Sequence, residues 1–155
     1  MQKIVPFLWF DTQAGDAAHF YVSVFKNSSI ENVSRFTNEE GSDQVMSVSF
    51  ILDGQEFNAL NGGPVFTFSP AISFFVNCED QVEVDRLWNQ LSDGGEQQQC
   101  GWLKDKYGIS WQIIPTVLGE LLGDEDPVKA QNVMEAMLTM NKIDIAELQK
   151  AYRSE

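Results

Sequence analysis

One order of secondary-structure elements repeats along the chain. A short apolar strand comes first, then an amphipathic helix and then extended stretches, and this order returns about 67 residues later. The first set lies near residues 3–10, 13–26, 29–37, 44–52 and 55–61, and the second near residues 70–77, the helix after Asp80, 97–103 and 107–114. The repeat predicts an α+β fold of paired βαβββ modules that form a curled mixed sheet.

Turn and capping residues separate these elements. Asp53-Gly54 is a hairpin signal, Asp80 with Glu83 makes a capping pair, and Gly94-Gly95 ends the second helix. We therefore expect one domain over residues 1–155, divided into a first module at 1–63, a second module at 64–115 and a helical tail at 116–155.

The tail departs from the repeat. Asp126-Pro127 supplies an N-cap followed by proline at the first helical position, and Asp144 with Glu147 forms a second capping pair, so two helices are expected at about 128–140 and 145–153. Their methionine-rich surface comprises Val133, Met134, Met137, Leu138 and Met140. Packing on the protein's own sheet and a subunit interface both remain open for this surface.

Charge and composition exclude several classes of protein. The 155 residues include 23 acidic and 10 basic side chains, a net charge of −13, whereas nucleic acids and anionic membranes need a positive surface. The apolar run at residues 4–10 is too short to span a membrane. Because Cys78 and Cys100 form no CxxC motif, we expect a reduced, cytoplasmic protein without nucleic-acid or membrane partners.

Alternation along the strands predicts a pocket. Apolar side chains alternate with small hydroxyl, amide or aromatic ones, so the two kinds face opposite sides of the sheet. Helices are expected on the apolar side. If the sheet curls, the polar side would line a pocket for an uncharged or weakly polar small molecule. The alternative is that this side is simply exposed to solvent. The expected ligand contacts are Phe10, Ser47, Ser49, Glu56, Asn58, Ser73, Phe75, Trp102, Ser110 and Gln112.

Residues for histidine, thiol or zinc chemistry are scarce. His19 is the single histidine and falls on the polar face of the first helix, so we expect it at the surface. Cys100 precedes Gly101, and a small buried residue is expected there rather than an activated thiolate. Neither zinc-binding spacing nor a glycine-rich phosphate loop occurs. No catalytic residue is assigned.

Five segments together resemble one branch of a known superfamily. They are PFLWFDTQAGDAAHFYVSVF, LDGQEFNALNGGP, AISFFVNCEDQVEVDRLW, CGWLKDKYGISWQIIP and PVKAQNVMEAMLTMNKIDIAEL, which span nearly the whole chain. They look like the PhnB-like branch of the vicinal oxygen chelate superfamily, which includes glyoxalase I, bleomycin-resistance proteins and extradiol dioxygenases. This branch often carries the label 3-demethylubiquinone-9 3-methyltransferase. The resemblance implies the glyoxalase/bleomycin-resistance fold.

The resemblance also implies where a metal would bind. Superfamily enzymes usually place it on four inward side chains, typically histidine or glutamate, one on each of the first, fourth, fifth and last strands. Laying this chain on that pattern gives Ile4, Asn58, Ala71 and Gln112. Isoleucine and alanine cannot coordinate, and neutral amides are weak ligands for a divalent ion, so we expect no metal and no other cofactor.

Three functions are compatible with these patterns. The first is a metal-free homodimer that binds a small organic molecule, which Asn58 and Gln112 orient. The second is an enzyme, either a methyltransferase, as the family label suggests, or a metal-assisted isomerase or oxygenase that uses Glu56. The chain lacks the glycine-rich turn that commonly holds S-adenosylmethionine. The third is a protein-interaction module that uses the acidic surface and the methionine-rich tail.

Overall fold

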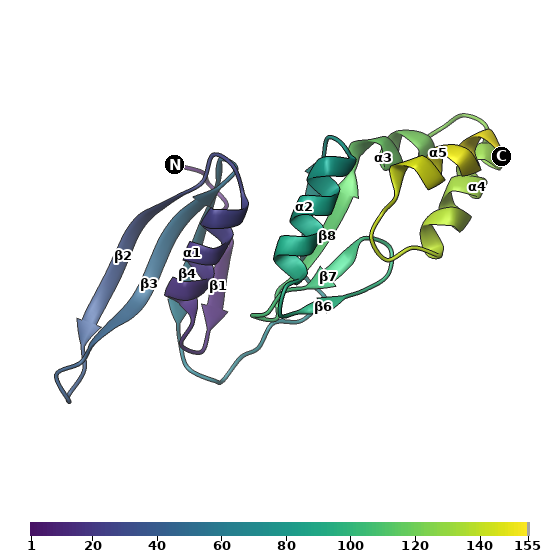
Figure 1. Ribbon diagram of the computed structural model, residues 1–155. Helices are drawn as coiled ribbons and strands as arrows, with labels where there is room; N and C mark the ends of the chain where they lie inside the picture. Colours follow the sequence, from purple (N-terminus) through teal and green to yellow (C-terminus); the bar gives the residue numbers. More distant parts are fainter. Residues whose placement is uncertain (155) are drawn as a thin grey trace. The chain divides into compact units, whose positions relative to one another are not determined.

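The structure is a computed structural model that describes residues 1–154 (Figure 1). Contacts between residues divide the chain into two compact units, one covering Met1–Phe68 and the other starting at Ser69. Each unit contains one module with its own four-stranded sheet, and the second unit also contains the helical tail. The predicted α+β class, the paired modules and the helical tail are confirmed, and the strands of the described residues form two sheets rather than one.

The first module places one helix against one face of its sheet (Figure 1). Its elements are β1 (Phe7–Phe10), α1 (Ala14–Val24), β2 (Ser29–Thr37), β3 (Asp43–Leu52) and β4 (Gln55–Asn61). The strand order is β1-β4-β3-β2, with β1 parallel to β4 and the other neighbours antiparallel. Beneath α1, the rings of Tyr21, Phe50 and Phe57 stack with centroid separations of 6.5 and 5.5 Å.

The second module repeats this arrangement with shorter strands. Its elements are β5 (Ser73–Cys78), α2 (Gln81–Ser92), β6 (Glu96–Gln97), β7 (Trp102–Lys104) and β8 (Ser110–Pro115). The order β5-β8-β7-β6 matches that of the first sheet, with β5 parallel to β8. The predicted cap of α2 is confirmed, because the Asp80 carboxylate accepts a hydrogen bond from the Glu83 backbone N–H at 2.9 Å.

A buried carboxylate holds the turn between β7 and β8. Asp105 is 2% exposed, and its Oδ1 accepts hydrogen bonds from the backbone N–H groups of Tyr107 and Ile109 at 2.9 and 3.0 Å. Its Oδ2 accepts a third from the indole N–H of Trp111 at 2.9 Å. A buried charge is tolerated only when it is hydrogen-bonded, and here the three bonds supply that condition.

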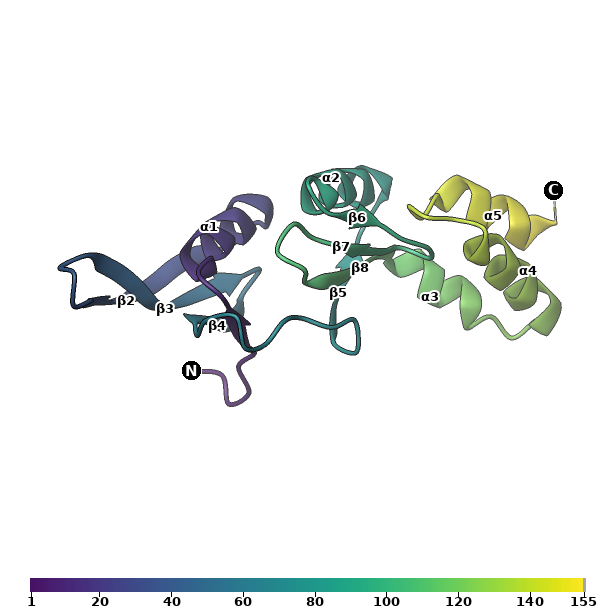
Figure 2. The ribbon, with the colours of Figure 1, turned by 90° about the horizontal axis from the view of Figure 1, so that it is seen from below.

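The tail contains three helices instead of the two expected. They are α3 (Thr116–Leu122), α4 (Pro127–Leu138) and α5 (Ile145–Arg153) (Figure 2). Asp126 and Asp144 cap α4 and α5 as predicted: Asp126 accepts from the N–H groups of Val128 and Lys129, and Asp144 accepts from that of Glu147. The helices share a small core of Ile114, Leu118, Val133, Ile143 and Leu148. Met137 and Met140 pack against this core, while Met134 and Leu138 are 36% and 55% exposed.

Hydrogen bonds fasten the tail to the second module. The Gln81 side chain donates to the Ile143 carbonyl at 3.0 Å and accepts from the Ile145 N–H at 2.8 Å. Lys142 lies 3.0 Å from Asp85, and the Gln81 amide together with this lysine holds the pKa of the Asp85 carboxyl below its usual value. The position of the tail on the second module is therefore fixed by specific contacts and not by apolar packing alone.

Two expectations about the surface can be compared with the structure. His19 is exposed on α1, as predicted. Among the described residues, no helix combines the length and the apolar character that crossing a bilayer would require.

Candidate functional site

Each sheet has one face that its own helix does not cover. These two open faces, one in each module, carry similar side chains at equivalent positions. The parallel register places Phe7 beside Asn58 in the first module and Phe75 beside Gln112 in the second. The two phenylalanines are 59% and 53% exposed. The internal repeat therefore includes an aromatic side chain and an amide at equivalent places on the open faces.

On the first module, the amide is paired with a hydroxyl. Ser49 Oγ donates to Asn58 Oδ1 at 2.8 Å, and Ser47 lies two residues away on the same strand face. Glu56, also on this face, accepts a hydrogen bond from the Gln2 backbone N–H at 3.1 Å. These predicted residues share one open face, and Glu56 is held by the N-terminal segment.

On the second module, Gln112 is the central polar side chain. Its Nε2 donates to Ser73 Oγ at 2.9 Å, and within residues 1–154 its side-chain oxygen accepts no hydrogen bond. Gln112 pairs in register with Phe75 on β5 and with Trp102 on β7, so the three side chains lie on the same face of the sheet. The structure thus brings together four of the predicted residues around an amide oxygen that is available to a hydrogen-bond donor.

Phe75, Trp102 and Gln112 line a cavity of about 280 Å³, whereas Ser73 is not part of its lining. The sheet and the loop before β7 contribute Phe75, Asn77, Cys100, Trp102, Gln112, Ile114 and Pro115, and the tail contributes Thr116, Leu118, Gly119, Leu122 and Met137. Cys100 is the one titratable residue of this lining. The size is close to the lower end of the range for small-molecule pockets, and the mixture of apolar walls with a few amides is typical of them.

Sequence reasoning missed part of this lining. Asn77 follows the same alternation as Phe75 and could have been found from it. Cys100 was expected to be buried, but it is partly exposed and faces the cavity, with its Sγ 3.7 Å from the Met137 carbonyl. The contribution of α3 was missed because the helix itself was not predicted, although Leu118, Leu121 and Leu122 have helical spacing.

Seven of the ten predicted ligand contacts do not line this cavity: Phe10, Ser47, Ser49, Glu56, Asn58, Ser73 and Ser110. Two of them, Phe10 and Ser110, are also buried. Phe10 is 2% exposed on the helix-covered face of its sheet, where Phe7 and Trp9 alternate with it toward the open face. The prediction placed the side chains of this strand one residue out of register. Because side chains alternate between the two faces of a sheet, a shift of one residue exchanges the covered face and the open face. Ser110 is 1% exposed, and its Oγ has no hydrogen-bond partner among the described residues, so it does not line the cavity.

The residues at the expected metal positions do not fit a metal. Ile4 and Ala71 precede β1 and β5, and both are exposed, so neither is an inward strand residue. The register partners of Asn58 and Gln112 are two phenylalanines, which cannot coordinate an ion. No group of three or more histidine, cysteine, aspartate or glutamate side chains suited to a metal occurs in residues 1–154.

The other cysteine lies outside the cavity. Cys78 is fully buried at the end of β5, and burial raises the pKa of its thiol to about 12, with a further contribution from the charge of Glu83. A thiol with such a high pKa is protonated at neutral pH and is a poor nucleophile. Cys78 is therefore a packing residue.

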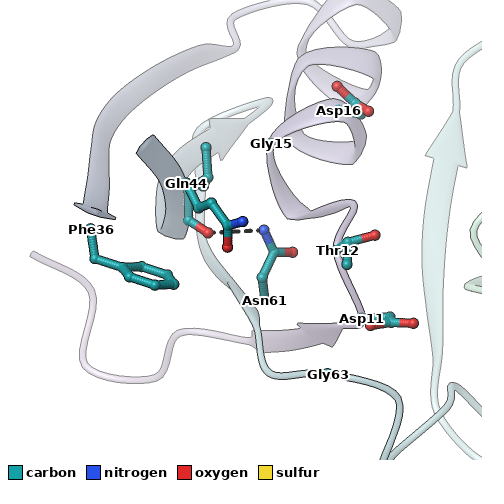
Figure 3. Close-up of a pocket in the computed structure, with 9 residues that line it drawn as sticks. Asp11, Thr12, Gly15, Asp16, Phe36, Gln44, Asn61 and Gly63 are labelled. Carbon is teal, nitrogen blue, oxygen red and sulfur yellow. Dashed lines mark hydrogen bonds between the residues drawn. The ribbon is translucent and has the colours of Figure 1, made fainter. Parts of the chain in front are cut away.

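A second pocket, of about 490 Å³, lies beside the first turn of α1 (Figure 3). Its central side chain is Asn61, which accepts from the Ala14 N–H at 2.8 Å and donates to the Val45 carbonyl at 3.1 Å. Figure 3 shows Asp11 and Thr12 turned away from this amide. Since the Asn61 amide already joins the start of α1 to β3, we assign it a structural role and take the cavity beside Gln112 as the candidate site.

Comparison with known proteins agrees with this architecture. The sequence profile of the 3-demethylubiquinone-9 3-methyltransferase family matches residues 2–114. The chain belongs to this family. A PhnB protein from Bacillus cereus that carries the same description is 38% identical, with a TM-score of 0.68, and the match covers 74% of this chain and 99% of the Bacillus protein. No match was found among curated proteins.

Two more distant structures share the fold of this family member. A protein from Pseudomonas aeruginosa is 20% identical with a TM-score of 0.63, and the match covers 74% of this chain and 98% of that one. A fosfomycin resistance protein from Listeria monocytogenes, solved with Mn(II) and sulfate, is 14% identical with a TM-score of 0.50, over 72% of this chain and 90% of that one. Together they support the glyoxalase/bleomycin-resistance fold.

Proposed function

We propose that this family member binds a small, uncharged organic molecule in the cavity beside Gln112, without a metal. The observation that carries the proposal is the lining itself. It offers the amides of Asn77 and Gln112 among aromatic and aliphatic walls, and it contains no carboxylate, amine or imidazole. Burying a charged ligand there would cost free energy with no opposite charge to offset it, whereas a neutral molecule with one hydrogen-bonding group is well matched.

We further propose that the protein acts as a cytoplasmic homodimer in which the modules and the tail work as one domain. Large apolar side chains remain exposed in the single chain, among them Phe7, Val65, Phe66, Ile72 and Phe75. Exposed apolar residues of this size commonly mark surfaces that another protein covers. A second copy of the chain is the partner that this proposal names.

Native mass spectrometry of the purified protein tests both proposals. We expect a dimer that carries a non-covalent organic adduct, which is lost under denaturing conditions. Addition of S-adenosylmethionine or Mn²⁺ before measurement is expected to add no mass. Stoichiometric binding of either would contradict the metal-free binding function and favour the methyltransferase or metal-assisted alternative, and a monomer would contradict the dimer.

The role of Gln112 can be measured with a neutral aromatic amide, 1-naphthamide, as the probe. Replacing Gln112 with alanine is expected to weaken binding about fivefold, because one neutral hydrogen bond contributes on the order of 1 kcal/mol. Titration followed by ¹⁵N–¹H correlation spectra gives the dissociation constant. Gln131→Ala, on the exposed surface of α4, is the matched control and should bind like the wild type. Equal affinity of the Gln112 variant would remove this residue from the site.

A further inference from the structure

We infer that the tail determines which ligands the cavity accepts, and that Gly119 of α3 is its specificity-determining residue. This inference rests on the proposed binding function. The ligand class it implies is an uncharged molecule with two parts: a hydrogen-bond donor directed at the Gln112 oxygen, and a ring or short aliphatic group against the tail.

The tail supplies the apolar wall of the cavity. Leu118 and Leu122 come from α3 and Met137 comes from α4, and all three line the cavity together with the amides of Asn77 and Gln112. Leu118 is 4% exposed and belongs to the tail core, so this wall is part of a packed structure. The wall is also held in register with the sheet, because the backbone N–H groups of Cys100 and Gly101 donate to the carbonyls of Met140 and Asn141 at 2.8 Å each.

Neither the packing nor the backbone conformation at position 119 requires a glycine. A Cβ atom built at this position would meet no atom within 4 Å, so no close packing demands glycine. Its φ angle is not positive either, so the backbone conformation does not demand it. Glycine within a helix costs about 1 kcal/mol relative to alanine. Gly119 is exposed and lines the cavity, so we expect a larger side chain there to narrow it.

The part of the chain that builds this wall lies beyond the region that the family profile matches. The family profile ends at residue 114. The sheet face that presents Gln112 therefore lies within the matched region, whereas the helices α3 and α4 follow it. A wall added after the matched region can select ligands differently from the shared fold.

A cavity-filling substitution tests the inference. Gly119→Leu is expected to weaken 1-naphthamide binding by about tenfold or more, while the melting temperature is maintained, because leucine is a good helix former and its Cβ meets no neighbouring atom. Gly119→Ala adds one methyl group and should stay within about threefold of the wild type. Glu120→Leu is the matched control, since it places the same side chain one residue further along α3, outside the lining.

The outcomes separate this inference from the function on which it rests. Weaker binding by Gly119→Leu alone, with shifts at residues 100–102 and 112–122 of the wild type, supports the inference. Unchanged binding by Gly119→Leu, or equal loss in Glu120→Leu, overturns it and leaves the binding function standing. A wild-type protein whose signals at these residues do not respond to 1-naphthamide overturns the binding function itself. The charged analogue 1-naphthoate should bind at least about tenfold more weakly than the amide.

Discussion

Replacing Gly101 with alanine is expected to lower the free energy of unfolding by about 3 kcal/mol or more. Gly101 has φ = +82°, a conformation that residues with a side chain rarely adopt. An added Cβ would lie 2.7 Å from Ile114 Cδ1, 2.9 Å from the Ile113 carbonyl oxygen and 3.2 Å from Ile143 Cγ1. Two of these contacts are with β8 and the third is with the tail core. The unfavourable backbone conformation and the steric overlap would therefore both destabilise the place where the tail packs on β8.

Urea unfolding at equilibrium measures this effect, and Gly119→Ala provides the matched control. The same substitution in α3 should leave stability unchanged or raise it by about 1 kcal/mol, because the new methyl group meets no atom. The contrast between two glycine-to-alanine changes removes the general effect on the unfolded chain, which is similar at both sites. A midpoint for Gly101→Ala equal to that of the control would show that the loop before β7 can move away from the tail at little cost.

The regular elements of this fold were predictable because local signals and tertiary contacts agree. The predicted strands at 29–37 and 55–61 have the bounds of β2 and β4, since each is limited by turn residues such as Asp53-Gly54. The caps at Asp80, Asp126 and Asp144 were predictable for the same reason: a short acidic side chain can accept the first N–H groups only at a helix start.

The errors arose where the local signal is ambiguous. In FLWF every residue is apolar, so alternation cannot say which side chains face the helix, and only the pairing of Phe7 with Asn58 settles the phase. In α3, Gly119 and the β-branched Thr116 and Val117 weaken the helix signal, and the helix is stabilised by Leu118 packing in the tail core. The four lining residues that this helix supplies, Thr116, Leu118, Gly119 and Leu122, could therefore not be predicted.

Asp105→Ala is expected to destabilise the second unit by about 3–5 kcal/mol. The change would remove the acceptor of two backbone N–H groups and of the Trp111 indole N–H, in a turn where the replaced side chain is buried. A buried N–H group that loses its acceptor keeps the free-energy cost of its lost hydration and has no hydrogen bond to offset it. The turn directly precedes Ser110–Pro115, so its loss should also disturb the strand that presents Gln112.

Graded variants distinguish the lost hydrogen bonds from the lost charge. Asp105→Asn keeps an oxygen for the two backbone donors but places an N–H₂ group toward the Trp111 indole N–H, so we expect a smaller loss of stability than with alanine. Asp93→Ala, an exposed carboxylate at the end of α2, is the control and should change stability by less than about 0.5 kcal/mol. Near-ultraviolet circular dichroism and urea unfolding report the packing around Trp111 and the free energy together. If Asp105→Ala were as stable as the Asp93 control, the turn would be held by its backbone hydrogen bonds alone, and Gln112 would be positioned by the sheet without help from this carboxylate.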